Sequence, residues 1–293
     1  MNIRIRHSKY DKVAWVYVLP LIILSTLLLY YCIFFTVYSS FTDWNGISSE
    51  MNFIGLENYI KLFKDPYFYV ALKNNLLFFF FTVFIQAAVG LLVASLLKYK
   101  LPFSNVYKAI FFLPIAMATA IITAIFRIIL DPNMGSLNTM FHAVGLDFLA
   151  QAWLGDKRFA LMSIISVNIF QWMGFSMIFY YAALMSLPED VYESAKLDGA
   201  GFWRTLFSIT IPMLKGTTSV LIILGIVGSL KTFDIVKLLT NSGPGRATLF
   251  LNTYLYEKAF TSFDAGSAAA IGVCILVLAI SMSVIQLKLG KED

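Results

Sequence analysis

Long apolar runs alternate with short polar segments along almost the whole chain. The runs cover residues 13–38, 72–97, 106–130, 159–184, 217–239 and 266–287. Runs of this length suit helices that cross a bilayer, because a helix satisfies its own backbone hydrogen bonds in lipid. The strands of an outer-membrane barrel would instead alternate polar and apolar residues. The pattern therefore predicts an all-α integral membrane protein with six transmembrane helices.

Composition supports a membrane protein. Hydrophobic residues make up 59% of the chain and charged residues 13%, whereas water-exposed surface needs far more polar side chains. We expect residues 1–12 to form a basic cytoplasmic tail and residues 13–293 to form a single transmembrane domain. The isolated His7 and His142 suggest no metal site, and Cys32 and Cys274 lie inside apolar runs as packing residues.

Basic residues flank the first two runs and set the expected orientation. They are Arg4, Arg6, Lys9 and Lys12 before the first run, and Lys98, Lys100 and Lys108 after the second. Cytoplasmic loops carry an excess of lysine and arginine, so both segments are predicted to lie inside. Six spans then return the carboxyl terminus, with Lys288 and Lys291, to the same side. These flanks explain the basic charge, and nucleic acid binding is not expected.

The polar segment 186–214, between the fourth and fifth runs, predicts a cytoplasmic helix-turn-helix. Ser186 is a candidate helix cap, and Pro188 lies in the expected first turn. Gly199, with small residues around it, permits a tight turn and a close approach by another surface. A polar, structured insertion between two spans indicates contact with something soluble.

The second half of this segment shows helical spacing. Phe202, Leu206 and Ile209 recur at i, i+4 and i+7, which predicts an apolar stripe with Thr205 facing away. Pro212 is expected to end this helix, because proline cannot continue the helical hydrogen-bond ladder.

The order of residues in this segment resembles the EAA loop of ABC importer permeases. Glu193-Ser194-Ala195, three residues, Gly199, nine residues and Ile209-x-Ile211-Pro212 reproduce the spacing of that motif, with Ser194 in place of the usual alanine. The resemblance implies the type I importer permease fold and a coupling helix that docks on an ATPase. By carry-over, the coupling residues are Glu193, Ser194, Ala195, Asp198, Gly199, Ala200, Ile209, Ile211 and Pro212.

No GxxxxGK[ST] phosphate-binding loop is present in the sequence, so the chain is not expected to hydrolyse ATP or to bind a cofactor. The resemblance implies a translocation subunit, in which ATP and Mg²⁺ are used by two partner ATPase subunits. It also implies a homologous second permease subunit, an extracytoplasmic sugar-binding protein, and a multi-pass location in a bacterial or archaeal cell membrane. Loops elsewhere in the chain are similar to the carbohydrate branch of this family.

Polar residues within the fourth and fifth runs are candidates for the substrate pathway, since such groups are expensive in lipid and usually face a cavity or another helix. Amide groups hydrogen-bond sugar hydroxyls, and aromatic faces pack against the C–H side of a sugar ring. The candidates are Asn168, Gln171, Trp172, Phe175, Gly225, Gly228, Ser229 and Thr232. Resemblance to the maltose permeases places Asn168 and Ser229 at sugar-contact positions. Helix packing is the alternative for Gly225, Gly228 and Gln171.

Three other functions are alternatives to sugar import. Glycerol phosphate as the cargo would favour a cationic cavity, for which Lys231 is the available residue. An ion-coupled secondary transporter would need a carboxylate in the membrane. Asp234, three residues after Lys231, is predicted to form an ion pair with it on one helix face. A membrane-embedded enzyme would require clustered His, Asp or Glu, which the sequence does not indicate.

Overall fold

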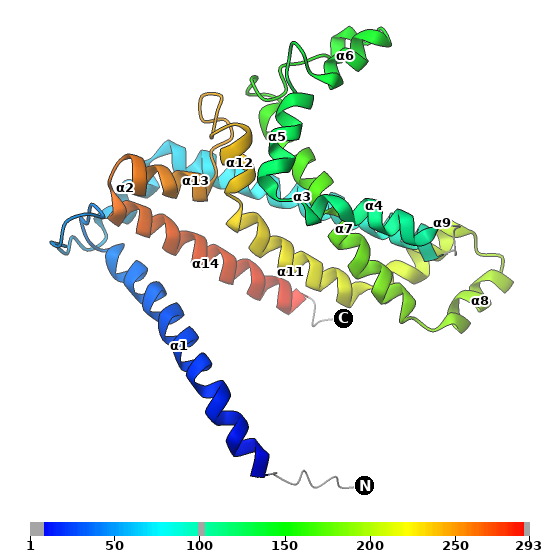
Figure 1. Cartoon of the computed structure of the whole chain (residues 1–293), viewed down its shortest axis with the longest axis horizontal. Coiled ribbons are helices and arrows are strands. Elements are labelled where there is room, and N and C mark those ends of the chain that lie inside the picture. Colours follow the sequence, from blue (N-terminus) through cyan, green and yellow to red (C-terminus); the bar gives the residue numbers. More distant parts are fainter. Residues whose placement is uncertain (1–8, 99–102, 290–293) are drawn as a thin grey trace.

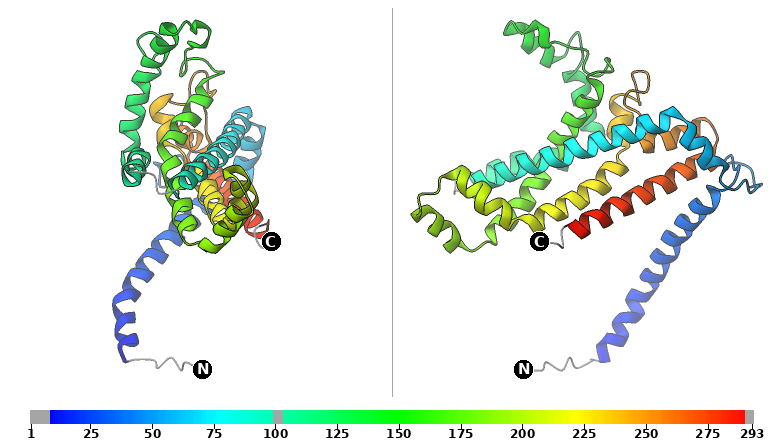
Figure 2. Two further views of the ribbon diagram at one scale, coloured as in Figure 1. Left: turned by 90° about the vertical axis from the view of Figure 1, so that its right-hand side faces the viewer. Right: turned by 180° about the vertical axis from the view of Figure 1, so that it is seen from behind.

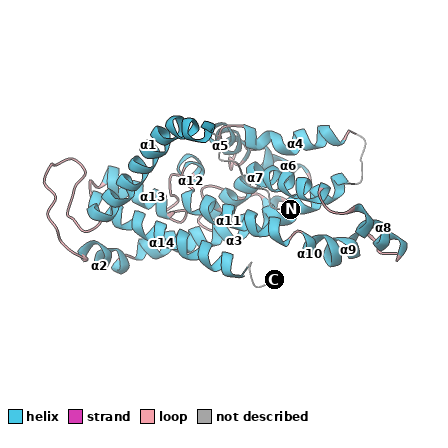
Figure 3. Cartoon of the chain, turned by 90° about the horizontal axis from the view of Figure 1, so that it is seen from below, coloured by secondary structure: helices cyan, strands magenta, loops and turns pink. Residues whose placement is uncertain are grey.

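A computed structural model describes residues 9–98 and 103–289. Arg4, Arg6, Lys100 and Lys291, which contribute to the expected orientation, lie outside these residues. Within the described part every element is a helix, and one isolated bridge joins Thr42 to Phe53 (Figure 3).

Four helices are each long and apolar enough to cross a membrane. They are α1 (Lys9–Ser39), α3 (Pro66–Lys98), α7 (Ala160–Met185) and α14 (Ala265–Leu289). Two bent pairs bring the number to six in the described chain. One pair is α4 (Ser104–Ala116) with α5 (Thr119–Ile129), at 97°, and the other is Phe202–Met213 with α11 (Lys215–Lys231), at 70°. The predicted all-α membrane fold is confirmed.

The fifth apolar run is not one helix, and the prediction of a continuous span over 217–239 is wrong. α11 ends at Lys231, Thr232 adopts φ −59° and ψ 122°, and α12 (Asp234–Leu239) begins two residues later. Lys231 and Asp234 therefore belong to different helices, so the predicted shared face does not exist. No ion pair joins them in the described structure.

Amide side chains from neighbouring helices donate hydrogen bonds to backbone carbonyls at the end of α11. Asn75 of α3 donates from Nδ2 to the Ser229 carbonyl at 3.0 Å, and Asn252 donates to the Leu230 carbonyl at 2.6 Å. Asn75 also accepts the backbone N–H of Leu251 at 2.8 Å. The last carbonyls of a helix have no partner within it, and in lipid an unpaired carbonyl costs several kcal/mol. These bonds allow the span to stop inside the membrane.

The short helices lie at two opposite ends of the bundle. α2 (Glu57–Lys64) and α13 (Leu251–Tyr256), which continues into the π-helical η3 (Glu257–Thr261), lie at one end. α8 (Glu189–Leu197) lies at the other, while α1 diverges from the remaining spans (Figures 1 and 2).

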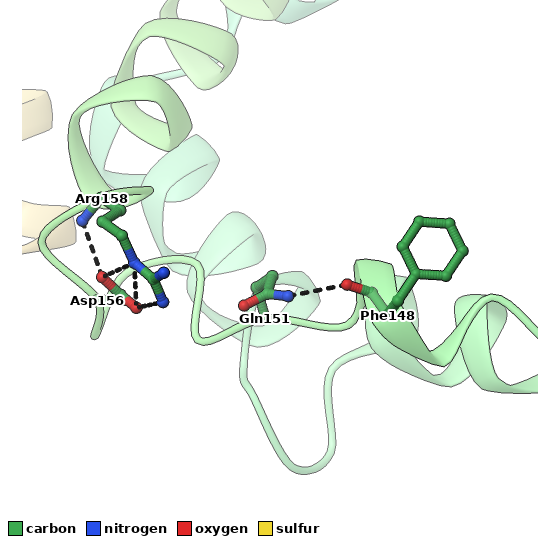
Figure 4. Close-up of polar contacts among 4 residues, drawn as sticks. All are labelled: Phe148, Gln151, Asp156 and Arg158. Carbon is green, nitrogen blue, oxygen red and sulfur yellow. Dashed lines mark hydrogen bonds and ion pairs between the residues drawn. The ribbon is translucent and has the colours of Figure 1, made fainter.

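A lobe beyond α5 contains α6 (Ser136–Ala143) and the 3₁₀ turn η1 (Asp147–Leu149). Near its return to α7, the Arg158 guanidinium donates to both oxygens of Asp156, and Gln151 donates to the Phe148 carbonyl (Figure 4). The bond from Arg158 holds the pKa of Asp156 below its usual range.

Two glycines let helices approach α7 closely. A Cβ on Gly90 of α3 would lie 2.7 Å from the Cβ of Ser176, and a Cβ on Gly174 would collide with the carbonyl oxygen of Phe111 on α4. Small residues permit such contacts between membrane helices, where van der Waals packing drives association. α3, α4 and α7 thereby form the packed centre of the fold.

Replacing Gly174 with alanine should destabilise the protein, because the carbonyl that the new methyl group would strike is backbone and cannot rotate away. We expect a loss of about 1–3 kcal/mol, the usual cost of overpacking, seen as a lower Tm in detergent. Gly216→Ala is the matched control, since no atom lies within 4 Å of the place that its methyl group would take. Equal melting temperatures for the two variants would contradict the assigned packing.

Candidate functional site

A cavity of about 460 Å³ lies between α3, α5, α7 and α11, beside the break between α11 and α12. All eight residues predicted for the substrate pathway line it: Asn168, Gln171, Trp172, Phe175, Gly225, Gly228, Ser229 and Thr232. The two predicted helices do face one space, which also receives residues from three other helices, α3, α5 and α12. Contact of these residues with a substrate stays a prediction.

An amide pair forms part of the cavity wall. Gln86 of α3 donates from Nε2 to the Asn168 side-chain oxygen at 3.0 Å, so Asn168 keeps its amide donors for other partners. Gln86 was missed in the sequence, although it is a polar residue in the middle of an apolar run. Helical spacing places residues only on their own helix and does not show which helices will meet.

The same helix, α7, also contributes a second amide and two aromatic rings to the wall. Gln171 donates to the Thr119 hydroxyl at 3.2 Å, and its own side-chain oxygen is buried without a hydrogen-bond partner. Thr119, also missed in the sequence, is the first residue of α5 after the bend. The Trp172 and Phe175 rings lie 6.1 Å apart and edge to face. The cavity thus offers both polar atoms and apolar ring faces.

On the α11 side of the cavity, one glycine packs against a neighbouring helix and another faces open space. A Cβ on Gly225 would collide with the Val83 side chain, so the helix-packing alternative explains this glycine. A Cβ on Gly228 would meet no atom within 4 Å, and this position opens to the cavity. The hydroxyls of Ser229 and Thr232 donate to backbone carbonyls of α11, at 2.9 and 3.0 Å.

One positive and one negative side chain line the cavity at the helix break. Lys231 ends α11, and Asp234 begins α12, and both are exposed. Lys231 and Asp234 together therefore add no net charge to the described wall of the cavity.

The first half of the segment 186–214 is α8, with a start that differs from the prediction. Ser186 does not cap it; it ends α7 and donates from Oγ to the Ala183 carbonyl at 2.7 Å. Pro188 precedes the first residue of α8 and directs the chain into the helix. Glu193 and Ser194 are exposed on α8, and Ala195 is buried.

A tight turn follows α8, as predicted. Gly199 adopts φ +74°, a conformation that favours glycine. Its N–H donates to the Lys196 carbonyl at 3.1 Å, and the N–H of Ala200 donates to the Ala195 carbonyl at 2.9 Å. Asp198 caps the end of the helix and is exposed. These two hydrogen bonds satisfy the last carbonyls of α8 and reverse the chain.

The second half comprises α9 (Phe202–Thr205), a π-helical turn η2 (Leu206–Thr210) and α10 (Ile211–Met213). The predicted outward direction of Thr205 is wrong, because Thr205, Leu206 and Thr210 are the buried residues. Thr205 lies three residues after Phe202, so a helix places it on the same face as Phe202 and Leu206.

Two aromatic rings are exposed on this half of the segment. Trp203 and Phe207 are 58% and 62% exposed and stack at 6.1 Å. Of the remaining coupling residues, Ile209 is half-buried, while Ile211 and Pro212 are exposed. Pro212 lies inside α10, and the bend into α11 comes at Leu214.

A fold of broken membrane helices around a cavity, with a structured loop at one end, defines a membrane translocation subunit. A profile of the binding-protein-dependent transport system inner membrane component family matches residues 65–291. The chain belongs to this family. It is the membrane permease subunit of an ABC importer, and it is a translocation component, not an enzyme.

Curated relatives and solved structures agree with this assignment. The probable ABC transporter permease protein YurN of Bacillus subtilis is 36% identical over 96% of this chain and 98% of its own length. The arabinooligosaccharides transport system permease protein AraP of the same organism is 33% identical over 83% of this chain and 78% of its own. A bacterial ABC transporter involved in alginate import superposes with a TM-score of 0.84 at 25% identity, covering 97% and 96% of the two chains. The same kind of transporter has also been solved with an alginate-bound periplasmic protein.

Cysteine labelling tests which face of α11 lines the cavity. In a background without Cys32 and Cys274, Gly228→Cys should react rapidly with a water-soluble maleimide, because this position opens to the cavity. Ile226→Cys, at a position only 2% exposed on the same helix, is the matched control and should react far more slowly. Equal rates at the two positions would contradict the cavity.

Proposed function

We propose that this chain forms half of a pathway for a sugar or oligosaccharide, working by alternating access. The observation that carries the proposal is the cavity wall, where amide groups and two aromatic rings face one space. Sugars need both, since their hydroxyls pair with amides and their C–H faces pack on rings. The relative named for arabinooligosaccharides supports the same cargo class.

The charges of the cavity favour an uncharged cargo. A glycerol phosphate would require an excess of positive charge, yet Asp234 lines the same space as Lys231. An ion-coupled mechanism is disfavoured by the family assignment, and the exposed Asp234 is not a buried membrane carboxylate of the kind that such transporters use.

The segment 186–214 is proposed to dock on an ATPase subunit, which would bind ATP and Mg²⁺. Leu197, Trp203 and Phe207 are exposed at 88%, 58% and 62%, and large apolar groups clustered on a surface mark contact with another protein. Glu193 is exposed on α8 in the same segment and is proposed to pair with a basic residue of that partner. This arrangement supports a coupling role for the segment.

Further partners complete the proposed importer. Each chain carries one coupling segment, so two ATPase subunits require two permease subunits, and the second is proposed to be a homologous but different chain. The cargo is proposed to arrive from an extracytoplasmic sugar-binding protein. Both termini and the coupling segment are proposed to face the cytoplasm, on the evidence of the basic flanks.

Transport in lipid vesicles tests the proposal. The complex, purified with its ATPase and second permease subunits, is reconstituted and given its binding protein and a panel of neutral and acidic oligosaccharides. We expect ATP-dependent uptake of a neutral member, with hydrolysis stimulated by the loaded binding protein. Uptake driven by an ion gradient and indifferent to ATP would overturn the proposal.

Reversing one charge tests the coupling segment. Glu193→Lys should weaken docking of the ATPase, because it places a positive charge against the expected basic partner. We expect uptake to fall by about tenfold or more, as loss of a charge-assisted contact worth about 1.5–3 kcal/mol implies. Glu50→Lys, an exposed acid far from this segment, should leave uptake unchanged. Normal uptake and ATPase assembly in Glu193→Lys would show that the segment has another role.

A further inference from the structure

A second cavity, of about 450 Å³, separates the coupling segment from the ends of α3 and α7. Ser95 and Lys98 of α3 line one side, and Tyr192 and Glu193 of α8 line the other. Because this space lies between α8 and the spans, few side chains can hold α8 against them. A side-chain contact that crosses this cavity therefore affects how a displacement of α8 is transmitted to the membrane helices.

Lys98 and Tyr192 form such a link. The Lys98 ammonium lies 3.0 Å from the centroid of the Tyr192 ring, and the nitrogen is buried without a hydrogen-bond partner. Glu189, in the first turn of α8, adds an electrostatic attraction. A lysine that only anchored the end of a span would extend its ammonium to water. Lys98 instead places it against an aromatic ring of the coupling segment.

Tyr192 also joins the two halves of the coupling segment. Its hydroxyl lies 3.3 Å from the hydroxyl of Thr210, at the end of η2. One side chain therefore contacts α3 through its ring and the second half of the segment through its oxygen. Loss of the ring should remove both the contact with Lys98 and the contact with Thr210, whereas loss of the hydroxyl should remove only the contact with Thr210.

α3 connects this contact to the substrate cavity. Lys98 lies twelve residues after Gln86, which corresponds to about 18 Å along a helix. Gln86 bonds Asn168 in the cavity wall, and Gly90, between the two positions, packs against α7. Tightly packed helices move as bodies, so displacement at one end of α3 is transmitted to the other.

We propose that Lys98 is a positioning residue for energy coupling, holding α8 to the end of α3 through the ring of Tyr192. It ties the movement of the coupling segment to the helix that carries Gln86. The inference rests on the proposed docking of an ATPase on segment 186–214. It adds a residue outside the motif that identified that segment.

The test compares matched variants in the reconstituted complex. The readout is the number of oligosaccharide molecules taken up per ATP hydrolysed, using the panel member that the wild type transports best. Co-purification of the ATPase subunits with each variant reports assembly. This ratio separates coupling from stability, because a merely structural role would lower uptake and hydrolysis together.

Lys98→Met keeps most of the stem and removes the charge, whereas Lys98→Arg keeps a cation over the ring. We expect Lys98→Met to lower the ratio by about five-fold, as loss of one desolvated cation–π contact implies, and Lys98→Arg to retain it. Tyr192→Leu should lower the ratio at least as far, because it removes this contact together with the bond to Thr210, and adding Lys98→Met to it should change little, since their shared contact is already lost. Tyr192→Phe should stay close to wild type.

Two results would overturn the inference: an unchanged ratio in an assembled Lys98→Met complex, or losses that add fully in the double variant. If Lys98→Met does not assemble, Tyr192→Phe against Tyr192→Leu decides in the same assay, and equal ratios for these two variants would overturn it. A wild-type complex that transports without ATP would instead refute the proposed function. The two failures are thus distinguishable.

Discussion

The hydrogen-bond demand of backbone groups inside a membrane is the constraint on which this structure depends. At the end of α11, Asn75 and Asn252 donate to the Ser229 and Leu230 carbonyls, and the N–H of Thr232 also donates to the Ser229 carbonyl. Asn75 spans the gap between α3, α11 and the start of α13 with one side chain. In lipid no water is available to replace these donors, so buried amides are needed wherever a span stops.

The cavity follows from this constraint. The third and fifth apolar runs are broken, at the bend before Thr119 and at Thr232, and Thr119 and Thr232 line the same space. In a continuous helix the backbone N–H and C=O groups form hydrogen bonds with one another. A broken one leaves side chains and non-helical backbone facing a cavity, which is how membrane transporters commonly build substrate sites. Polar residues that would be costly in lipid thereby become the lining of a pathway.

Much of this arrangement could be predicted from the sequence. Apolar run length located the spans, and the pattern of segment 186–214 predicted a helix-turn-helix with its turn at Gly199. Helical spacing also identified the α7 and α11 residues that share one cavity. These successes rest on local signals, in which each residue reports on its own helix.

The failures have a different physical origin. The run 217–239 is apolar throughout, and the break at Thr232 depends on amides from α3 and α13 that no local pattern reveals. Thr205 was assigned to the wrong face because the buried stripe was taken from its apolar members alone, whereas a residue three positions after Phe202 shares the face of Phe202. Gln86 and Thr119 were missed, since their place in the wall depends on which helices pack together. Sequence periodicity predicts which face of a helix is buried, but it does not predict which other helices pack against that face.

The central claim is that ATP, acting through the segment 186–214, changes the side from which the cavity is open. The most direct measurement is the sidedness of cavity labelling in sealed vesicles that contain the whole complex. A membrane-impermeant thiol reagent is added to one side at a time, with a cysteine at Gly228, before and after trapping the ATP-bound state. The account predicts that the reactive side switches when ATP is trapped. Reactivity that stays on one side, or that switches with an ion gradient in the absence of ATP, would contradict it.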